Sequence, residues 1–273
     1  MARGYRNTRT VQDPIAAVDA VVESDEAIEE RIRERFEILS DLTNASITGD
    51  ARALIVSGPP GLGKSFTVER ALNSWDPSEV NHTIIKGYVK ATGLYKTLYQ
   101  YRNEGQVIVF DDADALIYDD VALNLLKACC DTTDRRRVSW RSEAQFIDEE
   151  TAEIIPSSFD FNGTVIFITN LDMDAMVDRG HKIAPHLEAL ISRSHYIDLS
   201  LKTRRDYLIR IRQVIEDGML DNLTLEQKVD VISFIEIHAD SLRELSLRMA
   251  IKVANLRRAN PNWEKLARVT CLR

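Results

Sequence analysis

The chain has 273 residues, 44% hydrophobic and 29% charged, which is the balance of a globular protein long enough to bury its own core. Its 35 Lys and Arg against 43 Asp and Glu give a net charge of −8, which excludes a generally basic nucleic-acid coat protein but allows a local basic patch. Three cysteines, no apolar run of roughly 18–20 residues and no apolar export signal predict a cytoplasmic protein without disulfides or a membrane partner.

Two features precede the first predicted strand. Arg3, Arg6 and Arg9 form a short basic arm, for which a frayed tail is the plainer interpretation. Residues 25–43 predict an amphipathic helix, because apolar residues recur at helical spacing from Ile28 to Leu39. We expect the arm and this helix to form a first segment over residues 1–44.

Short apolar runs then alternate with helical patterns. The runs are nearly continuous, as strands buried on both faces are, and lie at 53–57, 83–85, 107–110, 165–169 and 196–201. Helices are predicted between them at 64–74, 94–102, 119–130 and 185–192. This alternation predicts an α/β domain over residues 45–201, with a five-stranded parallel sheet covered by helices. Only helical periodicity remains afterwards, which predicts a small all-helical domain over residues 202–273.

The segment GPPGLGKS, from Gly58 to Ser65, matches the phosphate-binding pattern G-x-x-x-x-G-K-[ST], with a predicted strand before it and a helix after it. In such a loop, backbone N–H groups and a helix N-terminus surround phosphate oxygens. Lys64 would reach the β- and γ-phosphates, and Ser65 would bind Mg²⁺. The predicted nucleotide contacts are Gly58, Pro59, Pro60, Gly61, Leu62, Gly63, Lys64, Ser65 and Phe66.

An acidic pair ends the strand predicted at 107–110. Asp111 would hold the Mg²⁺, and Asp112 would orient or deprotonate the attacking water, because phosphoryl transfer depends on positioning and charge neutralisation. A solvated acidic loop is the alternative, since further aspartates follow. The strand points to the same sheet edge as the phosphate loop, which favours the catalytic interpretation.

With these motifs, the chain resembles the AAA+ ATPase family over about residues 45–260. The resemblance implies ATP and Mg²⁺, a helical lid over the nucleotide and assembly into a ring. The second acid is usually Glu in that family, whereas this chain has Asp112, one methylene shorter, so the hydrolysis rate is open. The resemblance is to small stand-alone phage and mobile-element modules in particular.

The resemblance also implies residues that respond to the γ-phosphate. Asn170, after the strand at 165–169, matches sensor 1, which contacts the attacking water or the γ-phosphate. The resemblance also implies a sensor 2 arginine, which lies near the start of a lid helix and touches the γ-phosphate. Arg248 and Arg243 are the candidates, and we prefer Arg248 because Ser246 before it is a plausible helix N-cap.

Arg193, in a Ser-Arg-Ser segment similar to that of clamp loaders, would be the arginine finger that reaches the ATP of a neighbouring subunit. Arg179 is a weaker candidate for the same role. The alternative for Arg193 is an arginine at a helix C-terminus that binds backbone carbonyls of its own helix.

Two segments are candidates for contact with a macromolecular substrate. Residues 86–95 include Tyr88, which resembles the aromatic of unfoldase pore loops and also suits a nucleic-acid strand; alternatively Tyr88 ends a strand and Tyr95 packs inside. Residues 131–162 carry Arg135–Arg137, with residues 138–141 as one strand of a basic hairpin. The acids at 143, 148, 149, 150 and 153 could instead neutralise these arginines.

The sequence therefore predicts an ATP-hydrolysing ring, a hexamer or pentamer of this chain, that remodels a macromolecular partner. Single- or double-stranded DNA and a protein substrate both remain open, and the resemblance to phage modules favours DNA metabolism. A slowly hydrolysing assembly or recruitment module and a protein unfoldase are the alternatives. A P-loop small-molecule kinase is disfavoured by the predicted lid and by Arg193.

Overall fold

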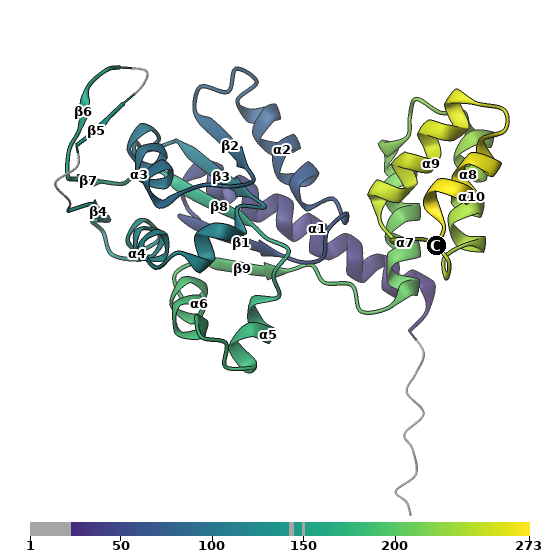
Figure 1. The fold of residues 1–273 in the computed structure, drawn as a ribbon, viewed down its shortest axis with the longest axis horizontal. Helices are drawn as coiled ribbons and strands as arrows, with labels where there is room; N and C mark the ends of the chain where they lie inside the picture. The colour runs from purple at the N-terminus through teal and green to yellow at the C-terminus, as the bar shows by residue number, and fades with distance from the viewer. Residues whose placement is uncertain (1–22, 142–144, 149–150) are drawn as a thin grey trace, which may run out of the picture.

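The computed structural model describes residues 23–141, 145–148 and 151–273. The predicted basic arm with Arg3, Arg6 and Arg9 lies outside these ranges, as do three of the acids expected to neutralise the arginine run, at positions 143, 149 and 150. Figure 1 shows a central sheet with helices around it, and a group of helices at the C-terminal end of the chain.

The sheet has five parallel strands in the order β2-β3-β8-β1-β9. Their bounds are β1 Ala53–Ser57, β2 His82–Lys86, β3 Val107–Asp111, β8 Thr164–Ile168 and β9 His195–Asp198. Every residue of β1, β3 and β8 is buried, as expected for strands covered on both faces. The predicted α/β class with a five-stranded parallel sheet is confirmed, and β8 lies between β1 and β3.

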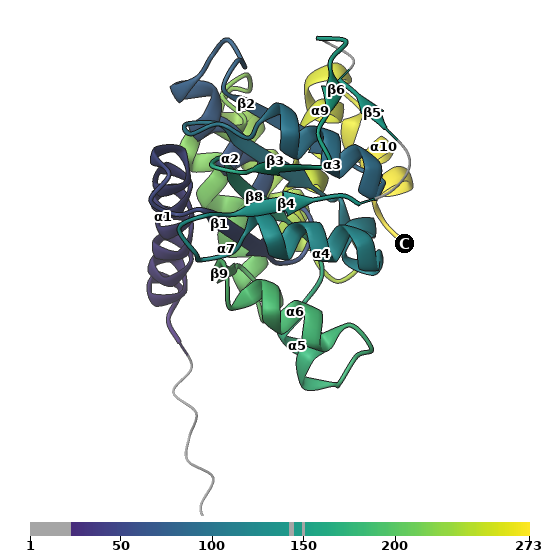
Figure 2. The same cartoon turned by 90° about the vertical axis from the view of Figure 1, so that its left-hand side faces the viewer.

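Alternate residues of each strand face opposite layers of helices. Leu54 and Val56 pack with α1 (Asp25–Thr48) and α2 (Lys64–Trp75). Ile55 and Phe110 face the other layer, which contains α3, α4 and α6. The bounds of these helices are α3 Ala91–Gln100, α4 Asp120–Cys129 and α6 Ala184–Ile191, with the shorter η1 Asp114–Tyr118 and α5 Met173–Asp178 beside them. Figure 2 shows the sheet between α1 and the layer of α3 and α4.

The helices predicted after residue 202 are confirmed. They are α7 (Arg204–Val214), the π-helical turn Ile215–Met219, α8 (Leu225–Ile237), α9 (Leu247–Ala259) and α10 (Trp263–Cys271). They share a separate apolar core, in which Phe234 and Val253 are almost completely buried. No helix within the described ranges is both long and apolar enough to cross a membrane. The boundary of an independent domain at 202 stays a prediction.

Two small antiparallel pairs interrupt the chain between α4 and β8. β4 (Arg137–Ser139) pairs with β7 (Ser158–Asp160), and β5 (Phe146–Ile147) pairs with β6 (Ile154–Ile155). The expected strand at 138–141 is therefore shorter and begins one residue earlier. The β5–β6 pair and the C-terminal helices lie at opposite ends of the molecule (Figure 1).

The arginine run is held by the fold itself. Arg135 pairs with Asp160 at 2.9 Å, because β4 and β7 run side by side. Arg136 is buried over the ring of Phe161 and donates to the carbonyl of Cys129 at 3.0 Å. Within the described residues, the acid that pairs with Arg135 is Asp160, which was not among the acids expected to fill that role.

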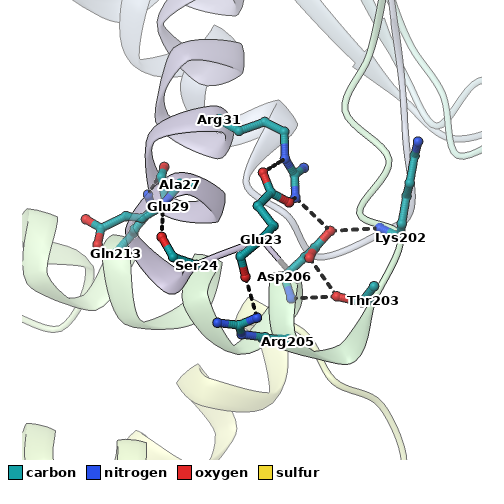
Figure 3. A network of polar contacts seen from close by, with 10 residues as sticks. All are labelled: Glu23, Ser24, Ala27, Glu29, Arg31, Lys202, Thr203, Arg205, Asp206 and Gln213. Carbon is teal, nitrogen blue, oxygen red and sulfur yellow. Dashed lines mark hydrogen bonds and ion pairs between the residues drawn. The ribbon is translucent and has the colours of Figure 1, made fainter. Parts of the chain in front are cut away.

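A polar network joins α1 to α7 (Figure 3). Arg31 of α1 bonds Glu23 at 3.0 Å and lies 3.4 Å from the buried carboxylate of Asp206 on α7. The side-chain amide of Gln213 donates to the Glu29 carbonyl at 2.6 Å. The N-terminal helix therefore fixes the first of the C-terminal helices against the sheet.

Candidate nucleotide-binding site

The phosphate-binding sequence forms a tight loop between β1 and α2. Gly58, Gly61 and Gly63 have φ angles of 145°, 76° and 97°, which side chains rarely adopt. A Cβ at Gly61 would fall 2.7 Å from the Cβ of Ser246 at the start of α9. The loop can therefore approach the C-terminal helices closely and leave the N-terminus of α2 open to an anion. Leu62 points its side chain into the core, so only its backbone faces the site.

Lys64 is buried at the centre of the loop. Its ammonium donates to the carbonyls of Gly58 at 2.5 Å and Pro59 at 2.9 Å, and to Oδ1 of Asn170 at 2.9 Å. Burial lowers the pKa of Lys64 to about 8, although the charges of nearby Asp112 and Asp111 oppose that shift. A phosphate anion beside Lys64 would favour its charged form.

Ser65 and Asp111 face each other across the sheet edge. The Ser65 hydroxyl donates to Oδ1 of Asp111 at 2.9 Å. Burial raises the pKa of Asp111, and the Ser65 hydrogen bond partly offsets this shift. In the described part of the chain, no group of three or more His, Cys, Asp or Glu side chains could hold a metal ion. One hydroxyl and one carboxylate nevertheless fit Mg²⁺, which commonly takes its remaining ligands from substrate phosphates and water.

Asp112 and Asn170 meet where β3 and β8 end. The side-chain amide of Asn170 donates to Oδ1 of Asp112 at 2.6 Å, while its oxygen accepts from Lys64. Asp112 has a φ of 55°, a left-handed conformation that costs free energy in a residue other than glycine. Such strain is typical of functional sites. The structure thus brings together Lys64, Ser65, Asp111, Asp112 and Asn170.

Four of these residues, all but Asp111, line a cleft of about 660 Å³ between the sheet and the C-terminal helices. Phe66 is 59% exposed and lines the cleft. Arg248 also lines it, whereas Arg243 is exposed outside it and donates its backbone N–H to Cys271. The geometry therefore favours Arg248 over Arg243.

Among the cleft residues that sequence reasoning did not assign to the site are Phe36 on α1 and Arg210 on α7. The guanidinium of Arg210 lies 3.5 Å from the ring centroid of Phe36, and its Nε is 3.4 Å from the Leu62 carbonyl. Burial lowers the pKa of Arg210 to about 10. Asp206, Arg210 and Gln213 recur at helical spacing and so share one face of α7. This spacing could have pointed to a buried polar face, but a polar helix face ordinarily meets solvent.

Arg193 lies outside the cleft at the end of α6. Its guanidinium donates to the Ala189 carbonyl at 2.7 Å and lies 3.9 Å from Asp131. The contact with Ala189 is the one expected of an arginine at a helix C-terminus. Arg179 is the C-cap residue of α5.

The loop after β2 presents Tyr88 to solvent. β2 ends at Lys86, and Tyr88 is 75% exposed, so the alternative that Tyr88 ends the strand is wrong. Tyr95 packs inside, as that alternative expected, and its hydroxyl donates to the Pro156 carbonyl at 2.7 Å.

Comparisons with known proteins place the chain beside a phage protein. No family model matches it. An uncharacterized 36.7 kDa protein from the nrdC–mobD intergenic region of Enterobacteria phage T4 is 37% identical over 255 residues, which cover 92% of this chain and 77% of the T4 protein.

Solved structures align more weakly. A RuvB variant from Thermotoga maritima gives a TM-score of 0.47 at 16% identity, over 91% of this chain and 72% of its own. Drosophila ORC bound to DNA gives a TM-score of 0.45 at 14% identity, over 98% of this chain and 68% of the ORC chain. NtrX from Brucella abortus in complex with ATP gives 0.44 at 12% identity over 86% of this chain, which spans 50% of the NtrX chain.

Proposed function

The chain belongs to the same family as the 36.7 kDa phage T4 protein, and we propose that it is an AAA+ ATPase that hydrolyses ATP to ADP and phosphate. One observation carries the proposal. Lys64, Asn170 and Asp112 form a continuous hydrogen-bonded chain at one edge of the sheet, next to the Ser65–Asp111 pair. These five side chains come from the phosphate loop and from the ends of two strands; Lys64, Ser65, Asp112 and Asn170 line one cleft, and Asp111 lies behind Ser65.

Each group has a defined task in this mechanism. The loop N–H groups and the Lys64 ammonium hold the β- and γ-phosphates of ATP. Asp112 accepts a proton from the attacking water, which Asn170 orients. Mg²⁺, held by Ser65 and Asp111, supplies charge neutralisation when bound. Arg248 reaches the γ-phosphate from α9 and couples its loss to movement of residues 202–273, which we propose act as the lid.

We further propose that subunits assemble into a ring of five or six copies, with Arg193 completing the site of its neighbour. Its half-buried guanidinium and its single carbonyl contact leave donors for a second chain. An arginine supplied in this way raises the rate of related phosphoryl transfers by a factor of about 10³–10⁵.

The macromolecular partner is proposed to contact the loop 87–90. Tyr88 and Lys90 are both exposed there, an aromatic and a cation suited to stacking on bases and binding phosphates. The arginine run is less suited, because Arg135 and Arg136 are engaged within the fold. DNA is therefore the partner we favour, with a protein substrate as the alternative.

The test is the steady-state ATPase rate with single-stranded DNA, double-stranded DNA, an unfolded protein, or none of these. We expect wild type to hydrolyse ATP, Lys64→Ala to lose activity and DNA to raise the rate. Tyr88→Ala should lose the stimulation, whereas Tyr118→Ala, at a tyrosine 55% exposed elsewhere, should keep it. Stimulation by unfolded protein alone would assign a protein substrate. Wild-type protein without ATPase activity under all conditions would contradict the proposed function.

A second candidate is a module that assembles on ATP and hydrolyses it slowly. The short side chain of Asp112 favours it, because a carboxylate one methylene shorter than that of Glu reaches the attacking water less well. Asp112→Glu separates the two: a rate increase of tenfold or more would indicate that the wild-type protein is tuned for slow turnover.

A further inference from the structure

Arg210 is a buried cation that pairs with no carboxylate in the part of the chain that the structure describes. The residue is only 8% exposed, and none of the ion pairs found in the described residues includes it. Asp217 acts on its charge from a distance and opposes the lowering of the Arg210 pKa by burial. Burying a charge without a partner is strongly unfavourable, so such a group normally has a counter-ion in the functional state.

The position of Arg210 indicates what that counter-ion is. One terminal guanidinium nitrogen lies 3.6 Å from a Cβ built on Gly63, the residue that caps α2. Its Nε makes one long hydrogen bond of 3.4 Å to the Leu62 carbonyl. The guanidinium therefore stands beside the helix N-terminus whose N–H groups are free to bind an anion.

The chemistry of the Arg210 guanidinium limits the kind of ligand that it can bind. A guanidinium has five N–H donors and no acceptor, so it suits an anion rather than a base edge that needs both. Its planar fork matches two phosphate oxygens. The ring of Phe36 lies 3.5 Å from the guanidinium and limits its tilt, and Phe36 belongs to α1, which the Arg31–Asp206 pair ties to α7.

We infer that Arg210 binds the phosphate held at the N-terminus of α2, and that α7 thereby contributes a second cation to the nucleotide site besides Arg248 of α9. This inference rests on the proposed function and adds a binding residue to it. The bound phosphate is shared by ADP and ATP, so the contact persists after hydrolysis. Arg210 then holds the product and keeps the cleft closed over it.

The test compares Arg210→Met with Arg212→Met. The first replaces the cation by an apolar side chain of similar length; the second removes one cation from the exposed face of the same helix, where Arg212 pairs with Glu236. ADP affinity is measured by calorimetry, and the melting temperature is measured with and without ADP. We expect Arg210→Met to weaken ADP binding about 10- to 100-fold, the loss typical of a charge-assisted hydrogen bond, and Arg212→Met to change it less than twofold.

Stability separates binding from a structural role. If the cation serves a ligand, Arg210→Met without ADP should melt at the wild-type temperature or above, while its stabilisation by ADP shrinks. A lower melting temperature with unchanged ADP affinity would overturn the inference and assign Arg210 to packing against Phe36. Arg210→Lys keeps the charge but not the fork, and it should lose several-fold in ADP affinity even if the methionine variant does not fold.

Failure of the inference differs from failure of the proposed function. Wild type and Arg210→Met that bind ADP equally, while Lys64→Ala does not, would overturn the role of Arg210 and leave the ATPase proposal standing. A wild-type protein that binds neither ATP nor ADP would overturn both.

Discussion

Gly61→Ala tests how the phosphate loop meets the C-terminal helices. The added Cβ would lie 2.7 Å from the Cβ of Ser246 and 3.2 Å from its hydroxyl oxygen. Neither Cβ can rotate away, because each is fixed by its own backbone. The loop carbonyl at Gly61 also accepts a hydrogen bond from the N–H of Leu247 at 2.8 Å, so the two backbones are held together. Relief requires the start of α9 to move away from the loop.

The expected cost has two parts. Alanine at a φ of 76° costs about 1–2 kcal/mol, and overpacking typically costs about 1–3 kcal/mol. Gly49→Ala is the matched control, since Gly49 has a φ of 85° and no atom within 4 Å of a built Cβ. It should therefore show the conformational cost alone. Urea denaturation should find Gly61→Ala less stable than Gly49→Ala by about 1–3 kcal/mol.

A second substitution identifies the clash itself. Ser246→Gly removes the opposing Cβ, and glycine at an N-cap costs only a few tenths of a kcal/mol relative to serine. Gly61→Ala combined with Ser246→Gly should recover most of the difference from Gly49→Ala. Equal stability of Gly61→Ala and Gly49→Ala would refute the contact between the loop and α9, and with it the closed cleft on which the site depends.

Three further predictions concern charge and hydrogen bonding. Burial lowers the pKa of Lys64 to about 8, and bound phosphate favours the charged form of its ammonium. ATP binding should therefore take up a proton, and ATP affinity should fall about eightfold between pH 7.5 and pH 9. Calorimetry in two buffers measures the affinity and the proton uptake, and Lys64→Arg should bind ATP without proton uptake. Burial raises the pKa of Asp206, but hydrogen bonds from Thr203 and the Lys202 backbone and the charge of Arg31 outweigh it, so the net pKa is lowered. Its contribution to stability is therefore present above about pH 4 and lost as the pH falls further: Asp206→Asn should be less stable by about 1–3 kcal/mol at pH 7, and urea denaturation should show the gap narrowing as the pH falls below about 4. Tyr95→Phe leaves the Pro156 carbonyl without its donor and should cost about 1 kcal/mol in the same assay, and no loss would contradict that hydrogen bond.

The sheet and the loop were predictable because their signals are local. Continuous β-branched runs mark strands buried on both faces, and β1 was predicted residue for residue. The polar residues directly after two such runs, Asp111–Asp112 and Asn170, were predicted as site residues, and the structure joins Asp112 to Asn170 by a hydrogen bond. Strand boundaries were predicted less accurately where an apolar run is longer than the segment that pairs with the neighbouring strand. The last strand was expected at 196–201, but β9 pairs with β1 only over His195–Asp198 before the chain turns away toward α7.

The missed parts depend on tertiary contacts. Arg210 lies on the polar face of α7, which helical periodicity assigns to solvent, yet α1 and the phosphate loop cover that face. Asp160 neutralises Arg135 from 25 residues away, through a strand pair of three residues that carries little pattern of its own. The short α5 was not predicted because its six residues contain fewer than two helical turns and so show little helical periodicity.

The most direct test of the shared ATP site mixes two inactive variants. Lys64→Ala lacks a working phosphate loop but keeps Arg193, whereas Arg193→Ala keeps the loop and lacks the proposed finger. In a ring with sites between subunits, random mixing pairs an intact loop with an intact finger at about a quarter of the interfaces. The account predicts that the equimolar mixture regains about a quarter of the wild-type ATPase rate. A mixture no more active than the sum of its two components, beside an active wild type, would contradict it.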